Sequence, residues 1–327
     1  MNTFSLVVMR ALTLGVLLAI AGIAAAQQPY PSKPIRLVSP YPPGGGNDIL
    51  SRLLAQKLSE GLGQQVIVDN RPGGNTIIGT EVTAKAPPDG YTILLAGSSH
   101  VLVPLLMKAP YDPIKDFAPV ATLAGGELVL LANTSVPANN LQEFIALAKS
   151  KPGQLNYASY GTGTPSHLAG EFFCMKAGIK MQHIPYKGSA PALADLIGGQ
   201  VQAFFSTIPS ALPQVNSGKV KAVAVTGEKR LPALPAVPTF GEAGLPDFAR
   251  IGGFYGIVAP AGTPKEIVDK LSAQIARILT LPDFKEKLAA QGVAPYSSTS
   301  EQFAALLKES FAANAKIIKA ANIKLEQ

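Results

Sequence analysis

The residues best suited to bind a ligand lie in a proline- and glycine-rich loop near the start of the chain. This loop, Pro40-Tyr-Pro-Pro-Gly-Gly-Gly-Asn-Asp48, is expected to join a strand to a helix. Its glycines let the backbone approach a ligand closely, and the free amides of the following helix suit an anion. Asn47 or Asp48 can cap that helix. Because a bare Asp48 carboxylate would repel an acid, capping or a water-mediated contact is its expected role. A tight turn before a capped helix is the alternative interpretation.

Two further polar loops follow predicted strands. Ser159-Tyr-Gly-Thr-Gly-Thr-Pro-Ser-His167 also joins a strand to a helix, with Thr164 as the expected cap and hydroxyls at Thr162, Thr164 and Ser166. Gly97-Ser98-Ser99-His100 ends another strand. In open parallel sheets, ligands bind at the carboxyl ends of the strands. The three loops come from both halves of the chain and therefore predict a cleft that closes on a small polar anion.

Enzymatic patterns are absent from the sequence. It contains no Gly-x-Ser-x-Gly elbow, no Walker loop and no complete dinucleotide fingerprint. An exported hydrolase would need Ser98, Ser99 or Ser166 to join a histidine and an acid. A zinc site would need three histidines without metal spacing, His100, His167 and His183, to converge by chance. We therefore expect no catalytic residue, no metal and no cofactor.

The single cysteine further limits the class of protein. Cys174 has no partner for an intramolecular disulfide, and its apolar helical surroundings predict a buried small side chain. The fold must therefore be held by its core alone.

The elements that position these loops follow an α/β rhythm. Strands are predicted at 35–39, 65–69 and 91–96 with helices between them, and the rhythm restarts at 128–132 and runs to 220–226. A last strand at 255–259 precedes three helices. If these return to the first half, the chain crosses twice between two domains, near 121–128 and 249–256, which makes a hinge and a cleft. We predict domain I at 27–124 plus 254–327 and domain II at 125–253.

Composition agrees with a globular chain. Of 327 residues, 15% are charged, below the usual ~25%, while 31 Gly and 28 Pro are too few for disorder. The net charge of +7 is carried by scattered basic residues without a basic stripe, so a nucleic-acid partner is not expected. The remaining positive field mildly favours small anions.

The N-terminus has the pattern of an export signal. Arg10 precedes an apolar run at 11–23, and Ala24-Ala25-Ala26 forms a small-residue cleavage site. Residues 1–26 are therefore predicted to be a cleaved signal peptide, with a retained membrane anchor as the alternative.

Taken together, ten segments resemble the tripartite tricarboxylate transporter substrate-binding family, also called Bug receptors. They run in order along the mature chain: Tyr30-Pro-Ser-Lys-Pro-Ile-Arg36, Pro42-Pro-Gly-Gly-Gly-Asn-Asp48, Asp69-Asn-Arg-Pro-Gly73, Ala86-Pro-Pro-Asp-Gly-Tyr91, Tyr111-Asp-Pro-Ile-Lys-Asp-Phe117, Lys151-Pro-Gly-Gln-Leu-Asn-Tyr-Ala158, Ser166-His-Leu-Ala-Gly-Glu171, Pro185-Tyr-Lys-Gly188, Pro209-Ser-Ala-Leu212 and Ala259-Pro-Ala-Gly-Thr-Pro264.

The resemblance implies a two-domain periplasmic binding protein, a type II Venus flytrap, with mostly parallel sheets and two interdomain crossings. It implies a periplasmic receptor, expected to be a monomer, that captures a small organic carboxylate and delivers it to membrane permease subunits. An exported sensor that feeds a membrane signalling partner is the alternative. Family roles in ligand binding carry over to Tyr41, Pro43, Gly44, Gly45, Asn47, Asp48, Ser98, Ser99, Thr162, Gly163, Thr164 and Ser166. The ring of Tyr160 is also expected to line the cleft.

Two segments of the sequence depart from the family pattern. Phe205-Ser206-Thr207-Ile208-Pro209-Ser210 stands where the family has Phe-Asp-Asn-x-Pro-Ser, so Ser206 replaces an aspartate that faces the cleft. This removes a partner for a ligand amino group and favours a di- or aromatic carboxylate over an amino acid. We keep Ser206 in the predicted set. Gly74-Asn75-Thr76-Ile77 also has fewer glycines than the family loop, which changes its expected contacts.

Overall fold

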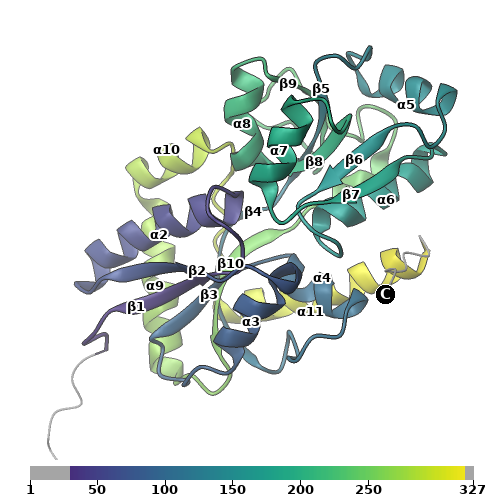
Figure 1. Cartoon of the computed structure of the whole chain (residues 1–327). Coiled ribbons are helices and arrows are strands. Elements are labelled where there is room, and N and C mark those ends of the chain that lie inside the picture. Colours follow the sequence, from purple (N-terminus) through teal and green to yellow (C-terminus); the bar gives the residue numbers. More distant parts are fainter. Residues whose placement is uncertain (1–29, 321–327) are drawn as a thin grey trace, which may run out of the picture.

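The computed structural model describes residues 30–320, so the predicted signal peptide lies outside the described residues. Two five-stranded sheets, each flanked by helices, form two domains side by side (Figure 1). We call the part built on the first sheet domain I and the part built on the second sheet domain II. The predicted two-domain α/β fold is confirmed.

Within residues 30–320 there are ten strands: β1 (Ile35–Ser39), β2 (Val66–Asn70), β3 (Thr92–Gly97), β4 (Phe117–Gly125), β5 (Leu128–Asn133), β6 (Asn156–Ser159), β7 (Gln182–Pro185), β8 (Ala203–Thr207), β9 (Val220–Val225) and β10 (Phe254–Pro260). The helices of the same range are α2 (Gly46–Leu62), η1 (Gly74–Thr76), α3 (Ile77–Ala84), α4 (Ser99–Leu106), α5 (Leu141–Ser150), α6 (Pro165–Ala177), α7 (Ser189–Ile197), α8 (Ile208–Asn216), η2 (Pro246–Arg250), α9 (Lys265–Thr280), α10 (Pro282–Ala290) and α11 (Ser300–Ala320).

The two sheets share one topology. Domain I has the order β2-β1-β3-β10-β4, and domain II has the order β7-β6-β8-β5-β9. In each sheet the first three strands are parallel and the fourth is antiparallel to both neighbours. The loops after β1, β2 and β3 therefore leave one edge of their sheet, and those after β6, β7 and β8 leave the equivalent edge of the other.

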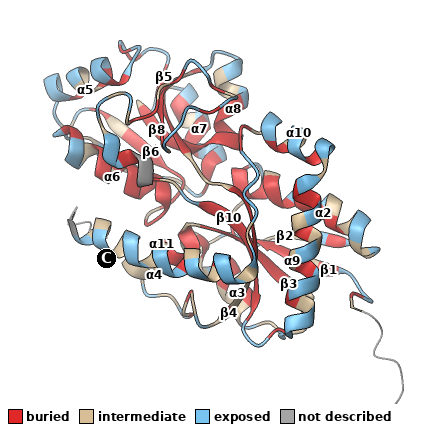
Figure 2. Cartoon of the chain, turned by 180° about the vertical axis from the view of Figure 1, so that it is seen from behind, coloured by how far each residue is buried: buried red, intermediate tan, exposed pale blue. Residues whose placement is uncertain are grey.

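Apolar strands and amphipathic helices build the core. The inner strands of both sheets are buried, β2 and β7 at the sheet edges are partly exposed, and the outer helix faces are exposed (Figure 2). On α2, the side chains of Leu50, Leu54 and Leu58 have no solvent exposure, as their helical spacing predicts. Predicted helix caps also form: Glu143 N donates to Asn140 Oδ1 at 2.8 Å, and Gln302 N donates to Thr299 Oγ1 at 3.2 Å.

The chain crosses between the sheets where the sequence predicts. β4 ends at Gly125 in domain I, β5 begins at Leu128 in domain II, and β10 returns to domain I at Phe254. The two crossings touch, because Gly126 N donates to Gly253 O at 2.9 Å. A Cβ on Gly126 would lie 2.8 Å from the Gly253 carbonyl carbon, so only glycine permits this approach.

Besides the short 3-10 helices η1 and η2, three elements occur that are not predicted from the sequence. β4, α4 and α8 each carry proline, at Pro119, Pro104, and Pro209 with Pro213, which ordinarily marks a break. β4 lies at the edge of its sheet and so can accommodate a proline. The α8 proline Pro209 lies in the first turn, where a missing amide costs no helical hydrogen bond.

Candidate functional site

The facing edges of the two sheets enclose a small cavity, here called the inner cavity. Its volume is about 40 Å³, and a buried water needs roughly 10–15 Å³ by the same measure, so a few waters or one small polar group fit. Its walls come from the loops after β1, β3, β6, β7 and β8 and from both crossings. The lining residues are Tyr41, Pro42, Gly45, Gly46, Asn47, Gly97, Ser98, Ser99, Gly126, Leu128, Tyr160, Pro165, Ser189, Thr207, Phe254 and Tyr255.

The first turn of α2 forms one wall. Gly45 is the N-cap and has no side chain, so the predicted capping by Asn47 or Asp48 is wrong. Asn47 is instead fixed to the sheet: its Oδ1 accepts from Ser39 Oγ at 2.8 Å and its Nδ2 donates to Leu95 O at 2.9 Å. What this wall offers a ligand is therefore its backbone, because the first amides of a helix have no intrahelical acceptor.

Four more helices begin at the cavity. Ser99 and Ser189 are the first residues of α4 and α7, Pro165 is the first residue of α6, and Thr207 is the N-cap of α8. Helix N-termini carry partial positive charge and stabilise anions. No charged side chain or histidine is among the lining residues within the described chain. The cavity thus favours an anion through neutral donors.

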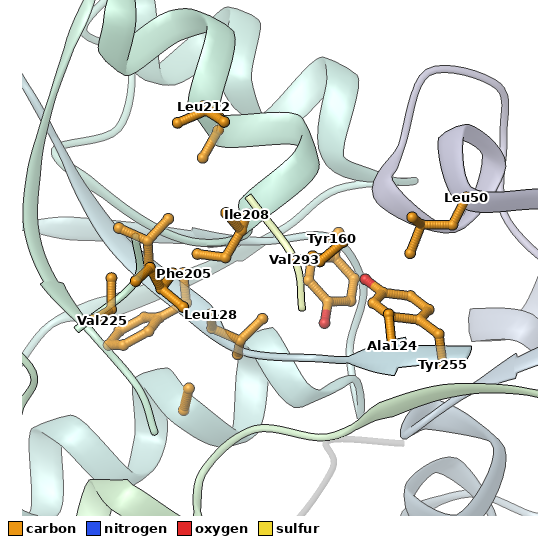
Figure 3. Packing of buried hydrophobic residues seen from close by; sticks show 14 of the residues in the cluster. Leu50, Ala124, Leu128, Tyr160, Phe205, Ile208, Leu212, Val225, Tyr255 and Val293 are labelled. Carbon is orange, nitrogen blue, oxygen red and sulfur yellow. The ribbon is translucent and has the colours of Figure 1, made fainter. Parts of the chain in front are cut away.

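Three tyrosines close the cavity. Tyr41 and Tyr160 form an edge-to-face pair with ring centroids 6.0 Å apart, and Tyr41 Oη lies 2.6 Å from Ser99 Oγ. The Tyr255 ring lies near Tyr160 (Figure 3). Burial raises the pKa of all three phenols above the ordinary value. They therefore stay neutral at physiological pH and can donate a hydrogen bond.

Contact between the domains shows that the cleft is closed. A Cβ on Gly46 of domain I would lie 2.7 Å from Thr207 Oγ1 of domain II. A Cβ on Gly188 of domain II would lie 2.6 Å from Pro42 Cγ of domain I. Glycine at both positions lets the two domains meet.

Asp48 braces the first loop and does not line the cavity. Its carboxylate accepts hydrogen bonds from Gly44 N at 3.0 Å, Arg52 Nε at 3.1 Å and Asn70 Nδ2 at 2.9 Å. Asn70 Nδ2 also donates to Tyr41 O at 3.0 Å. Burial raises the pKa of Asp48, but these hydrogen bonds and the Arg52 charge outweigh it and hold the pKa below its usual range.

Of the predicted binding residues, six line the inner cavity: Tyr41, Gly45, Asn47, Ser98, Ser99 and Tyr160. The other eight lie outside its lining: Pro43, Gly44, Asp48, Thr162, Gly163, Thr164, Ser166 and Ser206.

In the loop 159–167, the hydroxyls of Thr164 and Ser166 form hydrogen bonds within domain II. Ser166 Oγ donates to Phe205 O at 2.5 Å and Thr164 Oγ1 donates to Gly161 O at 2.6 Å. Thr164 is the N-cap residue of α6, as predicted, but its side chain makes no capping hydrogen bond. Ser206 is fully buried and its Oγ donates to Thr207 O at 3.1 Å.

Several lining residues, chiefly Ser189, Thr207 and Tyr255, are not among those predicted from the sequence. Ser189 and Thr207 follow strands β7 and β8 at the start of a helix, so the rule that selected the other loops could have found them. Tyr255 carries no such signal, because it reaches the cavity only through the return crossing.

The histidines do not meet at one site. His100 Nε2 lies 2.8 Å from Pro113 O in domain I, while the rings of His167 and His183 stack at 4.0 Å in domain II. Over residues 30–320 no group of three or more His, Cys, Asp or Glu side chains is arranged to hold a metal ion. Cys174 is partly buried, and burial raises the pKa of its thiol to about 12, so the thiol stays protonated. No helix in the described range is long and apolar enough to cross a membrane.

Comparison with known proteins places the chain in a family. The family model described as tripartite tricarboxylate transporter family receptor matches residues 50–323. Protein BugT of Bordetella pertussis is 36% identical over 318 residues, which cover 96% of this chain and 97% of that protein.

Solved structures of similar proteins agree with this family assignment. Rpa4515 of R. palustris with adipate has a TM-score of 0.87 and 34% identity, and covers 90% of this chain and 99% of its own. MatC of Rhodopseudomonas palustris with bound malate has a TM-score of 0.83 and 32% identity, and covers 88% of this chain and 100% of its own.

Proposed function

The chain belongs to the tripartite tricarboxylate transporter receptor family, whose members are solute-binding proteins and not enzymes, and from this premise we propose that it binds a small organic carboxylate in the inner cavity. The observation that carries the proposal is the meeting of five helix N-termini at a cavity lined by no charged side chain. Such an arrangement binds a carboxylate through backbone amides and neutral hydroxyls.

The proposed ligand set combines both domains. Domain I supplies the α2 amides near Gly45 and Gly46 together with Ser98, Ser99 and Tyr41. Domain II supplies Tyr160, Ser189 and Thr207. Adipate and malate in the two solved relatives support an acid as the ligand class.

Binding is proposed to work by domain closure. Residues 27–124 with 254–327 would move against 125–253 about the paired crossings, and sheet membership supports this division. A ligand that contacts both domains favours the closed form by the difference between its affinities for the two forms. Release would follow when a partner reopens the cleft.

The proposed location of the protein and its proposed membrane partner rest on the same family assignment. The predicted signal peptide at 1–26 would export the chain to the periplasm, where the receptor would deliver its carboxylate to permease subunits of a tripartite transporter. The family description, which is that of a transporter receptor, supports this partner.

A melting screen tests the proposed function. The mature protein is heated with mono-, di- and tricarboxylates, with the matching methyl esters as uncharged controls. A ligand at 100 times its dissociation constant adds about 2.7 kcal/mol to the free energy of unfolding, so a true ligand raises Tm while its ester does not. Equal responses to acids and esters, or no response to any acid, would refute the proposal.

A further inference from the structure

One motif of α6 has no part in the proposed binding site. Ser166-His-Leu-Ala-Gly-Glu171 is among the ten family-like segments, yet none of its residues lines the inner cavity. His167 and Glu171 are four positions apart on α6 and therefore lie on one face of the helix. Gly170 lies on the same face, and a Cβ there would lie 2.1 Å from Tyr157 Cε2 of β6. The motif therefore lets α6 pack closely against β6.

Three aromatic rings stack where α6 meets the sheet of domain II. Tyr157 and His183 are opposite each other in the β6–β7 pairing, and their ring centroids are 5.0 Å apart. The His183 ring also stacks on the His167 ring at 4.0 Å. Tyr157 Oη donates to Glu171 Oε1 at 2.5 Å, and the same carboxylate oxygen lies 3.9 Å from His167 Nε2. The protonated Cys174 thiol is close to Tyr157 and Glu171 and completes the titratable groups around the stack within the described residues.

Both histidines of this stack hold the loop 159–167. Gly163 N donates to His167 Nδ1 at 3.2 Å. Ser159 Oγ lies 2.7 Å from His183 Nε2, and the same hydroxyl exchanges hydrogen bonds with the main chain of Gly161 at 3.1 and 3.2 Å. Neither histidine lines the inner cavity, so each can act on that cavity only through the loop.

The loop held in this way is a part of domain II that meets domain I. The Tyr160 ring packs against the Tyr41 ring, and both residues line the inner cavity. A Cβ on Gly161 would lie 2.8 Å from Asn75 Oδ1 of domain I. The position of residues 160–163 therefore affects one wall of the inner cavity and the fit of the two domains in the closed form.

The hydrogen bond from Gly163 determines the protonation state of His167. Nδ1 can accept from an amide only while it carries no proton, so the neutral ring holds its proton on Nε2, toward Glu171. A second proton on this ring would deprive the Gly163 amide of its acceptor and place a positive charge against the His183 ring. Burial lowers the pKa of His167 and lowers that of His183 to about 3. The anchored loop is thus fully favoured above the ordinary histidine pKa of about 6.5 and is weakened as pH falls below it.

We propose that His167 is a positioning residue for the ligand cleft, which holds residues 160–163 in place through the Gly163 amide and releases them when its ring is protonated. Ligand affinity is then highest at neutral pH and falls in acid, in addition to any effect of protonating the ligand itself. This inference rests on the proposed function, because it assumes that Tyr160 belongs to the wall that contacts the ligand.

NMR of the ligand-free mature protein tests the anchor without any ligand. We expect the Cε1 proton of His167 to titrate with a midpoint below about 6.5, and the amide resonance of Gly163 to shift with the same midpoint. In His167→Asn, whose Oδ1 can accept from Gly163 N but does not titrate, the Gly163 amide should show no such shift. A Gly163 amide that does not follow the titration of His167, or a His167 midpoint at or above about 6.5, would overturn the proposal.

Calorimetry tests the effect on the cleft. Affinities for adipate, malate and each further acid that raises Tm in the melting screen are measured at about pH 7.5 and about pH 4.5. The parent protein should lose about threefold or more affinity beyond the loss in His167→Asn, because protonation of the acid affects both proteins equally. His167→Leu, which has no acceptor for Gly163 N, should bind weakly at both pH values. His100→Gln, a change of the buried histidine in domain I, should keep the pH response of the parent.

The outcomes separate this proposal from the proposed function. Equal pH responses of the parent protein and His167→Asn would overturn the positioning role while the proposed function stands. If no acid binds, the proposed function fails and the role of His167 in ligand binding fails with it.

Discussion

The two glycine loops that join strand to helix, 40–48 in domain I and 159–167 in domain II, are alike in sequence but differ in use. The first contributes Tyr41, Pro42 and three backbone positions of the α2 start to the inner cavity. The second contributes only Tyr160 and Pro165, the latter without an amide hydrogen. The hydroxyls of Thr164 and Ser166 are hydrogen-bonded to main-chain carbonyls within domain II.

The difference shows that a hydroxyl in a polar loop is a ligand donor only if the fold leaves it free. Buried carbonyl groups need partners, and the nearest hydroxyl supplies one. The Ser166 hydroxyl donates to the Phe205 carbonyl in this way, although the two residues are 39 positions apart in the sequence. In the first loop the side chains of Asn47 and Asp48 are likewise engaged, so the backbone remains for the ligand.

The largest effect is expected from a methyl group at the domain contact. Gly46→Ala should lower carboxylate affinity at least 100-fold, which corresponds to about 2.7 kcal/mol, because the new Cβ would lie 2.7 Å from Thr207 Oγ1 and hold the cleft open. In Gly45→Ala the nearest atom is 3.8 Å away, so the loss should be much smaller. Equal losses by calorimetry would contradict the difference between the two glycines.

The hydrogen bonds that Asp48 makes in the loop 40–48 should contribute to the free energy of unfolding. Asp48→Asn should lower the free energy of urea unfolding by about 2–3 kcal/mol, because a buried carboxylate that accepts several hydrogen bonds is lost. The pKa of Asp48 is lowered in the folded state, so its stabilisation is present above the unfolded pKa and is lost as pH falls through the folded pKa. Asp269→Asn, at an exposed ion pair with Lys265, is the control and should unfold almost as the parent does.

At acidic pH, protonation of His100 should lower the stability of domain I. Burial lowers the pKa of His100 to about 4, despite a hydrogen bond with Pro113 O. A lowered folded pKa means that stability is full above the unfolded pKa of about 6.5 and falls as pH drops toward 4. At pH 5 the loss should be about 2 kcal/mol relative to pH 7. His100→Gln should lack this share of the pH dependence in thermal melts, and an unchanged profile would refute the assignment.

The smallest expected effects are those of removing single hydroxyls, and they distinguish a hydroxyl that stabilises the fold from one that contacts the ligand. Ser166→Ala should cost about 1 kcal/mol of stability, because Phe205 O loses its donor, and should leave carboxylate affinity unchanged. Ser99→Ala should instead lower affinity several-fold, because Ser99 lines the cavity and lies 2.6 Å from Tyr41 Oη. A loss of affinity in Ser166→Ala would restore the second loop to the binding site.

Much of the fold is predictable because its signals are local. Hydrophobic spacing locates α2, and Asn140 and Thr299 mark the starts of their helices through contacts within one turn. The sequence left the return of the last strand to the first half as a condition, and in the structure β10 pairs with β3 and β4. β4, α4 and α8 were not predicted because each contains proline, which ordinarily marks a break. Whether a strand or helix tolerates its proline depends on tertiary context, as Pro119 at the sheet edge and Pro209 in the first turn of α8 show.

The candidate site was less predictable because its contents depend on distant partners. Strand ends could be located from the sequence, and six predicted residues line the cavity. Which hydroxyls remain free could not be read locally, as the Ser166–Phe205 bond shows. Tyr255 enters from a crossing more than 200 positions after Tyr41, and only the folded chain brings the two together.

A crystal structure of the mature protein with the tightest carboxylate from the melting screen tests the central claim most directly. The account predicts the carboxylate in the inner cavity, within hydrogen-bond distance of the first-turn amides of α2 and of hydroxyls from domain II, with no lysine or arginine side chain beside it. Density for the acid outside this cavity, or a carboxylate paired with a basic side chain, would contradict it.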